Sequence, residues 1–306
     1  MITNFESFIS ELQTNTNQVI VVAGAHDPEV LSAVKKAEEL DLAQFILVGN
    51  RELMTTYSKD IDFDISKHNI LDSDSPSEIG ELSVGLVRTG RASVLMKGII
   101  ETPILLKAVL NKQKGLKTDQ LLSHVGVFQI NSLNRLLLIA DSAVNIAPNV
   151  DEKEKIIMNT LIVADSLGIR EPKVALIAAS EHVNEKMPAT KDAAILVKKN
   201  EEVNYFKPAI LAGPLALDNA ISSKAAAIKN IKNAVVGNAD ILIMPTIEAG
   251  NILVKSLEYF SNSQKAGVIM GASVPIILTS RASTDDTKLY SIALSLLIQK
   301  KVLEMD

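Results

Sequence analysis

Cysteine is absent from this chain of 306 residues, and so is Trp. Without cysteine there can be no disulfide, thiolate zinc site, iron–sulfur cluster or cysteine nucleophile, and the absence is typical of a reducing compartment. Aromatic residues make up only 4% of the chain although 47% of it is hydrophobic, so the apolar content is mainly aliphatic. Aliphatic residues fill buried parallel strands and the helices that cover them, which favours an α/β fold.

An excess of basic charge and long apolar runs are lacking as well. The chain has 31 Lys and Arg against 36 Asp and Glu, a formal net charge of -5, which argues against binding nucleic acid by neutralising its phosphates. The most apolar run, residues 266–279, contains Gly, Ser and Pro and is shorter than the roughly 20 residues of a membrane-spanning helix. The N-terminus, MITNFESFISELQ, lacks the basic segment of a signal or transit peptide. We expect a soluble, cytoplasmic protein with two domains.

Short aliphatic runs alternate with amphipathic stretches along the first half of the chain. Strands are predicted at 18–24, 45–49 and 93–98, and helices at 28–42, 78–90 and 102–111. This βαβ rhythm predicts parallel pairing. Two strand-like runs at 121–130 and 135–140 are separated by only four residues and predict a hairpin.

A second α/β unit is predicted beyond the hairpin. Helices are expected at 151–167, 189–198, 217–229 and 249–261, strands at 173–179 and 240–244, and a break at Gly213-Pro214. Two last apolar runs, 267–272 and 275–278, precede a helix from about 284 to 303. This final run and helix are candidates to return to the first sheet.

Ligands of parallel sheets bind beyond the carboxyl ends of the strands, and one such end is the most distinctive. There Leu278 is followed by Thr279, Ser280 and Arg281, just before a helix that opens with Asp285 and Asp286. Arg offers a planar fork for phosphate oxygens, Ser280 offers a hydroxyl, and the helix N-terminus adds partial positive charge. This predicts an anion site, for which a helix cap beside a surface Arg is an equal alternative.

Lys97 and Gly98 form a similar strand end. Gly98 permits a close approach of the backbone, Lys97 offers a cation for a phosphate, and Thr102 is expected to cap a helix with Pro103 in its first turn. The alternative is an ordinary connection with a solvated Lys.

Four further strand ends carry polar groups suited to binding, although helix capping or an ordinary loop is the simpler explanation of each taken alone. They hold the pairs Asp141 and Ser142, Asn184 and Lys186, Asp218 and Asn219, and Glu248 and Asn251. Motifs for dinucleotides, for P-loop phosphates and for the hydrolase nucleophile elbow are missing, and the four histidines are scattered, so no metal site is expected.

Several long segments together resemble the phosphate acetyl/butyryltransferase family, most closely its phosphate butyryltransferases. The resemblance covers nearly the whole chain, and the matching segments follow one another in the same order as in the family. The segments include MKGIIETPILLKAVLNKQKGLKT, LLSHVGVFQ, RLLLIADSAVNIAP, NEKMPATKDAA, GPLALDNAIS, ADILIMPTIEAGNILVKSLEYF and VPIILTSRAS.

The resemblance implies two α/β domains with a cleft between them, in an architecture similar to isocitrate and isopropylmalate dehydrogenases. The first domain would comprise residues 1–127 and 271–306, and the second residues 128–270. The implied reaction converts acyl-CoA and inorganic phosphate into acyl phosphate and CoA, reversibly, by direct attack in a ternary complex. CoA would be a co-substrate, with no metal and no permanently bound cofactor.

The resemblance also implies roles for residues of this chain. Ser280 would stabilise the transition state, Arg281 would bind phosphate, and Asp286, or alternatively Asp285, would remove the thiol proton. Lys117, Asp141 and Ser142 match positions that line the cleft. Departures from the family pattern are Lys117 in place of Arg, Ala212 in place of Asp, and Ile228 and Asn230 in place of His and Gly.

We therefore expect a cytoplasmic phosphate butyryltransferase that acts on acyl-CoA and phosphate as a homodimer or larger homo-oligomer, without nucleic acid or membrane partners. The first alternative is a phosphate acetyltransferase. A non-catalytic acyl-CoA or phosphate-binding module would bind these ligands without releasing CoA, and a related dehydrogenase would need a nicotinamide cofactor and a divalent metal.

Overall fold

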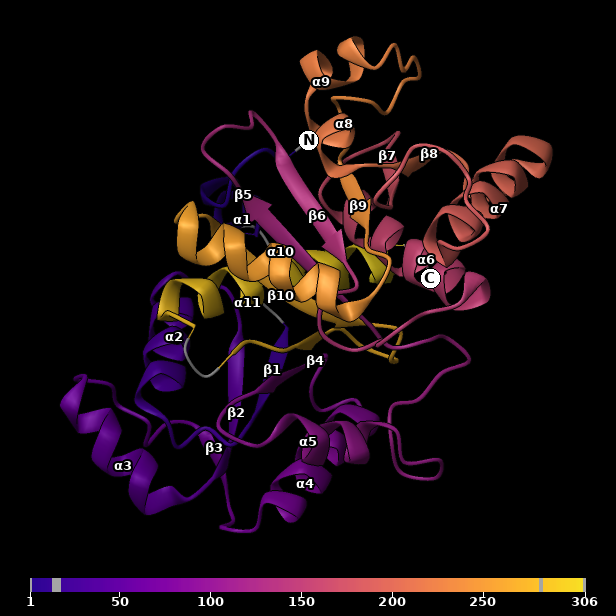
Figure 1. Ribbon diagram of the computed structural model, residues 1–306. Coiled ribbons are helices and arrows are strands. Elements are labelled where there is room, and N and C mark those ends of the chain that lie inside the picture. The colour runs from indigo at the N-terminus through magenta and orange to yellow at the C-terminus, as the bar shows by residue number, and fades with distance from the viewer. Residues whose placement is uncertain (1, 13–17, 281–282, 305–306) are drawn as a thin grey trace. The chain divides into compact units, whose positions relative to one another are not determined.

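The computed structural model describes residues 2–12, 18–280 and 283–304 (Figure 1). The chain divides into two compact units. The first unit comprises Phe5–Gln120 and Ala266–Asp306, and the second comprises Met1–Asn4 and Leu121–Lys265. Both units combine a sheet with helices, so the predicted α/β class is confirmed. No helix in the described ranges is long and apolar enough to cross a membrane.

The sheet of the first unit has the strand order β3-β2-β1-β4-β11-β10. All neighbours pair in parallel except β10 and β11, which are antiparallel. The strands are β1 (Val19–Ala23), β2 (Gln44–Gly49), β3 (Asn69–Asp72), β4 (Val94–Lys97), β10 (Gln264–Met270) and β11 (Ile276–Ile277). Because β11 pairs with β4, a strand from late in the chain lies beside strands from its beginning.

Several helices of the first unit begin at a polar side chain that accepts a hydrogen bond from the first turn. They are α1 (Glu6–Leu12), α2 (Pro28–Glu39), α3 (Arg51–Asp60), α4 (Pro76–Arg88), α5 (Thr102–Val109) and α11 (Asp285–Leu303). Asp27 caps α2 by accepting a hydrogen bond from the backbone N–H of Val30, with Pro28 in the first turn. Helix α4 packs on α5 and β1, and α11 packs on α2 and α1 (Figure 1).

Helix α11 differs from the other helices because it is buried on every side. Polar side chains such as Lys288, Ser291 and Ser295 are buried along it together with Leu294 and Ile298. A helix enclosed in this way holds its first turn in a fixed position, and that turn carries the two carboxylates expected from the sequence.

The second unit is also a sheet covered by helices, with the strand order β5-β6-β9-β7-β8. Strands β5 (Ser123–Gln129) and β6 (Leu136–Ala140) are antiparallel, which confirms the predicted hairpin, and β9 (Ile241–Ile243), β7 (Lys173–Ile177) and β8 (Ile210–Leu215) follow in parallel. The helices are α6 (Val150–Ser166), α7 (Pro188–Val203), α8 (Leu217–Ile221), α9 (Ser223–Ile228) and α10 (Ile247–Phe260).

Two local predictions in this unit are wrong. Gly213 and Pro214 do not break the chain but lie within β8. Among the described strands, β8 pairs only with β7. An edge strand tolerates Pro because the missing N–H of Pro is not needed for a second neighbour. The helix predicted at 217–229 is two helices, because Ser222 adopts an extended backbone and its side chain accepts a hydrogen bond from Ala225 N–H to start α9.

Candidate functional site

The carboxyl ends of β1, β4 and β11 lie side by side in the first unit. Ala23 is in register with Lys97, and Ile277 is in register with Met96. The residues that follow these three strands therefore meet at one edge of the sheet, which is where parallel sheets bind ligands. The predicted strand ends at Lys97 and Ser280 are brought together at this edge.

The turn after β4 crosses the turn after β1 at very short range. Gly98 N–H donates to Ala23 O at 2.8 Å, and Ile99 N–H donates to Gly24 O at 2.9 Å. Gly24 has φ +82°, and a Cβ on Gly98 would lie 2.0 Å from the Gly24 carbonyl oxygen. The close backbone approach expected at Gly98 is thus present.

Lys97 is 5% exposed, and its ammonium donates to Gly98 O at 3.0 Å and to Ile100 O at 3.2 Å. Its side chain is therefore buried, in contrast to the solvated Lys of the alternative interpretation. Thr102 does not cap α5 as expected, because the extended residue before the first turn is Glu101 and Thr102 already belongs to the helix. Lys117 is exposed and forms an isolated bridge with Ala272.

The predicted anion site leads into the N-terminus of α11. Ser280 is exposed beyond the end of β11 (Ile276–Ile277), and its carbonyl oxygen accepts from Ser283 N–H at 3.0 Å. Thr284 caps the helix by accepting from Thr287 N–H at 3.2 Å. Arg281, the predicted phosphate ligand, lies outside the residues that the structure describes.

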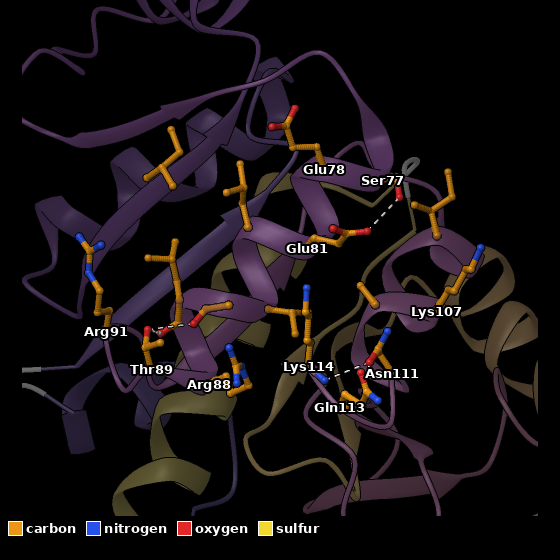
Figure 2. Close-up of a pocket in the computed structure, with 17 residues that line it drawn as sticks. Ser77, Glu78, Glu81, Arg88, Thr89, Arg91, Lys107, Asn111, Gln113 and Lys114 are labelled. Atoms are coloured by element: carbon orange, nitrogen blue, oxygen red, sulfur yellow. Dashed lines mark hydrogen bonds between the residues drawn. The ribbon is translucent and has the colours of Figure 1, made fainter.

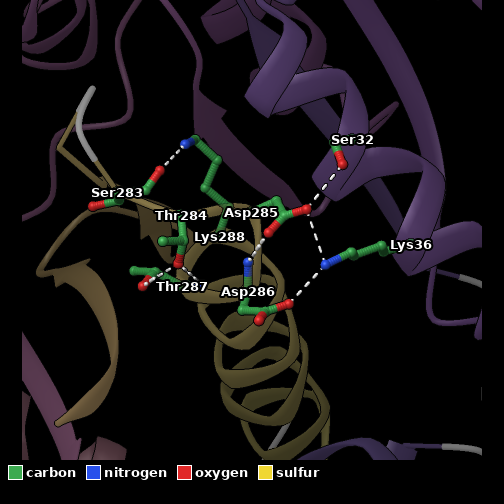
Figure 3. Close-up of polar contacts among 8 residues, drawn as sticks. All are labelled: Ser32, Lys36, Ser283, Thr284, Asp285, Asp286, Thr287 and Lys288. Carbon is green, nitrogen blue, oxygen red and sulfur yellow. Dashed lines mark hydrogen bonds and ion pairs between the residues drawn. The ribbon is translucent and has the colours of Figure 1, made fainter. Parts of the chain in front are cut away.

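Asp285 and Asp286 share one cation, Lys36 of α2, as Figure 3 shows. Lys36 Nζ lies 2.9 Å from Asp285 Oδ2 and 2.7 Å from Asp286 Oδ1. Asp285 Oδ2 also accepts from the Ser32 hydroxyl at 3.0 Å, and Asp285 Oδ1 accepts from Asp286 N–H at 2.9 Å. Both oxygens of Asp285 are therefore engaged.

The electrostatics of this cluster follow from its contacts. Burial alone would raise the pKa of the Asp285 carboxyl, but the hydrogen bonds from Lys36 and Ser32 outweigh it, so this pKa lies below its ordinary value. The hydrogen bonds to Asp286 and Asp285 raise the pKa of the Lys36 ammonium. Asp285 is held as a carboxylate, and the side chain of Asp286 is 59% exposed.

Lys288 lies one turn further along α11 and is 2% exposed. Its ammonium donates a hydrogen bond to the carbonyl oxygen of Ser283 (Figure 3). Burial lowers the pKa of Lys288, against the attraction of Asp27, Glu29 and Asp285. Sequence reasoning missed Lys288 and also Lys36, because neither belongs to a local motif.

In the second unit, Asp141 and Ser142 follow β6 and are both buried. The Asp141 carboxylate accepts from the backbone N–H groups of Ala143, Val144 and Asn145 at 2.8 to 3.1 Å and from Asn145 Nδ2 at 2.6 Å. This carboxylate therefore shapes the loop after β6. The cap of α6 is instead Asn149, so the competing explanation of Asp141 as an N-cap is wrong.

The Ser142 hydroxyl contacts a histidine that the sequence did not single out. His124 Nδ1 lies 3.0 Å from Ser142 Oγ, and burial lowers the pKa of His124 below 6.5 against the attraction of Asp141. Asn251 of α10 donates from Nδ2 to Ser142 O at 3.3 Å, which brings two predicted residues together. Glu248 is exposed, and Thr246 rather than Glu248 caps α10.

A second polar cluster of this unit joins the ends of β7 and β8. Lys229 Nζ lies 2.7 Å from Glu181 Oε1 and 3.4 Å from Asp218 Oδ2. Asn219 is fully buried and donates from Nδ2 to Glu181. Asp218 does not cap α8, because this helix begins after Ala216 without a side-chain cap bond.

Asn184 and Lys186 lie in an exposed turn before α7. Asn184 Oδ1 accepts from Lys186 N–H at 2.9 Å, and Asn184 N–H donates to Thr190 Oγ1 at 2.9 Å. The two predicted residues therefore belong to one ordered turn.

A groove of about 980 Å³ lies elsewhere in the first unit, between α4 and the segment that contains α5 (Figure 2). Arg88, Lys107 and Lys114 line it together with Glu78 and Glu81. None of the predicted site residues that the structure describes lines this groove.

Comparisons with known proteins agree over nearly the whole chain. The family model of phosphate acetyl/butaryl transferase matches residues 4–84 and 77–296. Phosphate butyryltransferase of Clostridium beijerinckii is 43% identical over 96% of this chain and 97% of that protein. A probable phosphate butyryltransferase of Bacillus subtilis is 46% identical over 95% of this chain and 96% of that protein.

The crystal structure of a branched-chain phosphotransacylase from Enterococcus faecalis V583 is also similar. It has a TM-score of 0.81 and 33% sequence identity, and the match covers 92% of this chain and 99% of that chain. Together with the strand ends and the first turn of α11 described above, these similarities establish that the chain belongs to the phosphate acetyl/butyryl transferase family.

Proposed function

We propose that this protein is a phosphate butyryltransferase, which converts butyryl-CoA and inorganic phosphate reversibly into butyryl phosphate and CoA. The observation that carries the proposal is the agreement in sequence with phosphate butyryltransferases over nearly the whole chain. The protein acts in the cytoplasm as a homodimer or larger homo-oligomer. CoA is a co-substrate, and no cofactor stays permanently bound.

In the direction of acyl-CoA synthesis, the thiol of CoA attacks the carbonyl carbon of butyryl phosphate. A thiol with a pKa near 8.5 is mostly protonated at neutral pH, so a base must take its proton as the carbon–sulfur bond forms. Charge develops on the carbonyl oxygen in the tetrahedral transition state, where a positioned donor is most effective. The carbon–oxygen bond then breaks, phosphate leaves, and the base returns its proton to solvent or phosphate.

Asp286 is the base in this proposal. The contacts of the cluster support Asp286 over Asp285, since both oxygens of Asp285 already accept hydrogen bonds. Within the described part of the chain, Lys36 contacts only Oδ1 of Asp286, which leaves Oδ2 to accept the thiol proton. The exposure of the Asp286 side chain is also what a group that meets a substrate requires.

Ser280 stabilises the transition state, and Arg281 binds phosphate. The exposed position of Ser280 at the carboxyl edge of the sheet supports its role. Further phosphate and CoA contacts are assigned to two sets of residues. In the first unit these are Lys97, Thr102 and Lys117, and in the second unit Asp141, Ser142, Asn184, Lys186, Asp218, Asn219, Glu248 and Asn251.

The test measures thiol release from acetyl-CoA and from butyryl-CoA at a fixed phosphate concentration. We expect kcat/KM to be about tenfold or more higher for butyryl-CoA, since added methylenes that meet apolar surface distinguish two substrates by about 1–3 kcal/mol. The family includes acetyl and butyryl transferases, so a preference for acetyl-CoA would replace the proposal with phosphate acetyltransferase. Binding of acyl-CoA with no phosphate-dependent thiol release would make the protein a non-catalytic module.

A further inference from the structure

Two buried polar groups near the start of α11 make fewer hydrogen bonds than they are able to make. The hydroxyl of Ser283 is buried and has no hydrogen-bond partner in the described part of the chain. The ammonium of Lys288 has three N–H groups, and its only hydrogen bond among the described residues goes to Ser283 O. Buried polar groups are almost always satisfied, so a buried unpartnered hydroxyl, together with a buried ammonium that has unused N–H groups, points to a missing ligand.

No carboxylate in residues 2–12, 18–280 or 283–304 forms an ion pair with Lys288, although three attract it from a greater distance. Asp27 is occupied by the cap of α2, and Asp285 is occupied by Lys36 and Ser32. A buried ammonium without a counter-ion is unfavourable unless an anion joins it. The missing ligand is therefore an anion.

The position of these groups indicates which anion this is. Ser283 N–H donates to Ser280 O, so Ser283 lies beside the proposed transition-state residue. Lys288 Nζ contacts the carbonyl oxygen of Ser283, so the ammonium lies against the backbone of the residue that carries the unpartnered hydroxyl. Within the proposed reaction, the anions that come to this edge are phosphate and the phosphoryl group of the acyl phosphate.

We propose that Ser283 Oγ and Lys288 Nζ form a subsite that binds the reacting phosphate. The proposal rests on the proposed function and adds two ligands to it. Phosphate accepts a hydrogen bond from the hydroxyl and charge-assisted hydrogen bonds from the N–H groups of the ammonium. Because both side chains are at most 3% exposed, these bonds form largely out of water, where they are strong.

The chain provides a matched control for the hydroxyl. Ser295 also lies on α11, is fully buried and has an unpartnered Oγ among the described residues, but it is three turns further along the helix. Ser283→Ala and Ser295→Ala each remove one unpartnered hydroxyl from a buried position. If the Ser283 hydroxyl had only a structural role, the two substitutions should have the same effect on the KM for phosphate.

The experiment compares steady-state KM values for inorganic phosphate and for butyryl-CoA. We expect Ser283→Ala to raise the KM for phosphate about three- to tenfold and to leave the KM for butyryl-CoA within about twofold. Ser295→Ala should change neither KM. Lys288→Met should raise the KM for phosphate about tenfold to a hundredfold, because it removes charge-assisted bonds.

A second measurement separates the subsite from the proposed reaction. The melting temperature of the protein is measured at increasing concentrations of inorganic phosphate, with sodium chloride at equal ionic strength as the reference. This measurement does not require catalytic turnover. If the wild type shows phosphate-specific stabilisation that Ser283→Ala weakens, the subsite stands even if no thiol is ever released.

Other outcomes overturn the subsite. If the KM for phosphate is the same in the wild type and in both serine variants, the proposed subsite is wrong. This conclusion does not depend on whether Lys288→Met folds. A KM that rises for butyryl-CoA rather than for phosphate would assign the two groups to the phosphates of CoA and refute the proposal.

Discussion

Replacing Gly98 with Ala should force apart the two turns that cross at the carboxyl edge of the first unit. The added Cβ would lie 2.0 Å from Gly24 O and 2.7 Å from the Gly24 carbonyl carbon, whereas real Cβ atoms essentially never come closer than 3.0 Å to such atoms. The obstacle is backbone, so no side chain can rotate away to make room. One of the two turns must move by about 1 Å.

This movement acts on two short hydrogen bonds, Gly98 N–H to Ala23 O at 2.8 Å and Ile99 N–H to Gly24 O at 2.9 Å. Losing both costs about 1 kcal/mol each, and the overpacking adds about 1–3 kcal/mol. We therefore expect the free energy of unfolding to fall by about 3–5 kcal/mol. Because Lys97 precedes Gly98, catalytic activity should fall as well.

The assay is urea unfolding followed by circular dichroism, since the chain has no Trp. Gly85→Ala is the control, because Gly85 lies in α4 and lines the groove of Figure 2, where an added Cβ meets no atom within 4 Å. That substitution should raise stability by about 0.5–1 kcal/mol through helix propensity. If Gly98→Ala unfolds at the same urea concentration as the wild type, the crossing is not as tight as described and the reasoning is refuted.

Three further predictions concern charged groups. Asp286→Asn should lower kcat at least about a hundredfold, with Asp285→Asn affecting kcat less; the reverse order would make Asp285 the base. Lys36→Met should lower stability at pH 7 by about 1 kcal/mol or less, because the ion pairs are partly exposed. Asp285 has a lowered pKa, so the stability difference between the wild type and Lys36→Met should vanish as pH falls through that pKa, below 3.8. The measurement is urea unfolding of both proteins at pH 7 and at pH 3. Equal stability differences at the two pH values would contradict this prediction. His124 has a lowered pKa, so the protein should lose stability as pH falls below 6.5, by up to about 1.4 kcal/mol per pH unit. Thermal melts at several pH values measure this dependence of stability on pH. His124→Gln should make the dependence weaker.

Much of the fold follows from patterns in the sequence. The helix expected at 28–42 is α2 (Pro28–Glu39), which Asp27 and Pro28 mark at its start. The strand expected at 93–98 is β4 (Val94–Lys97), an uninterrupted buried run. Elements without a strong apolar pattern were not predicted, including β3, whose strand Asn69–Asp72 has exposed ends and half-buried central residues.

The candidate site is less accessible to sequence reasoning because its contacts are long-range. Ser280, Asp285 and Asp286 are predictable from a strand end followed by a helix start. Lys36 is 250 residues from Asp286 in the sequence, and nothing in the local pattern of α2 sets it apart from other helix lysines. The contact between Ser142 and His124 likewise depends on pairing of β5 with β6, and not on a motif.

The place of β11 in the sheet has a consequence for biosynthesis. Strand β4 has β1 on one side and β11 on the other, and β11 begins only at Ile276. While the ribosome is still translating the intervening residues, the hydrogen-bonding edge of β4 is left open, and unpaired edges of this kind promote association between nascent chains. We therefore expect slow or stalled translation before codon 276 to favour aggregation of this protein.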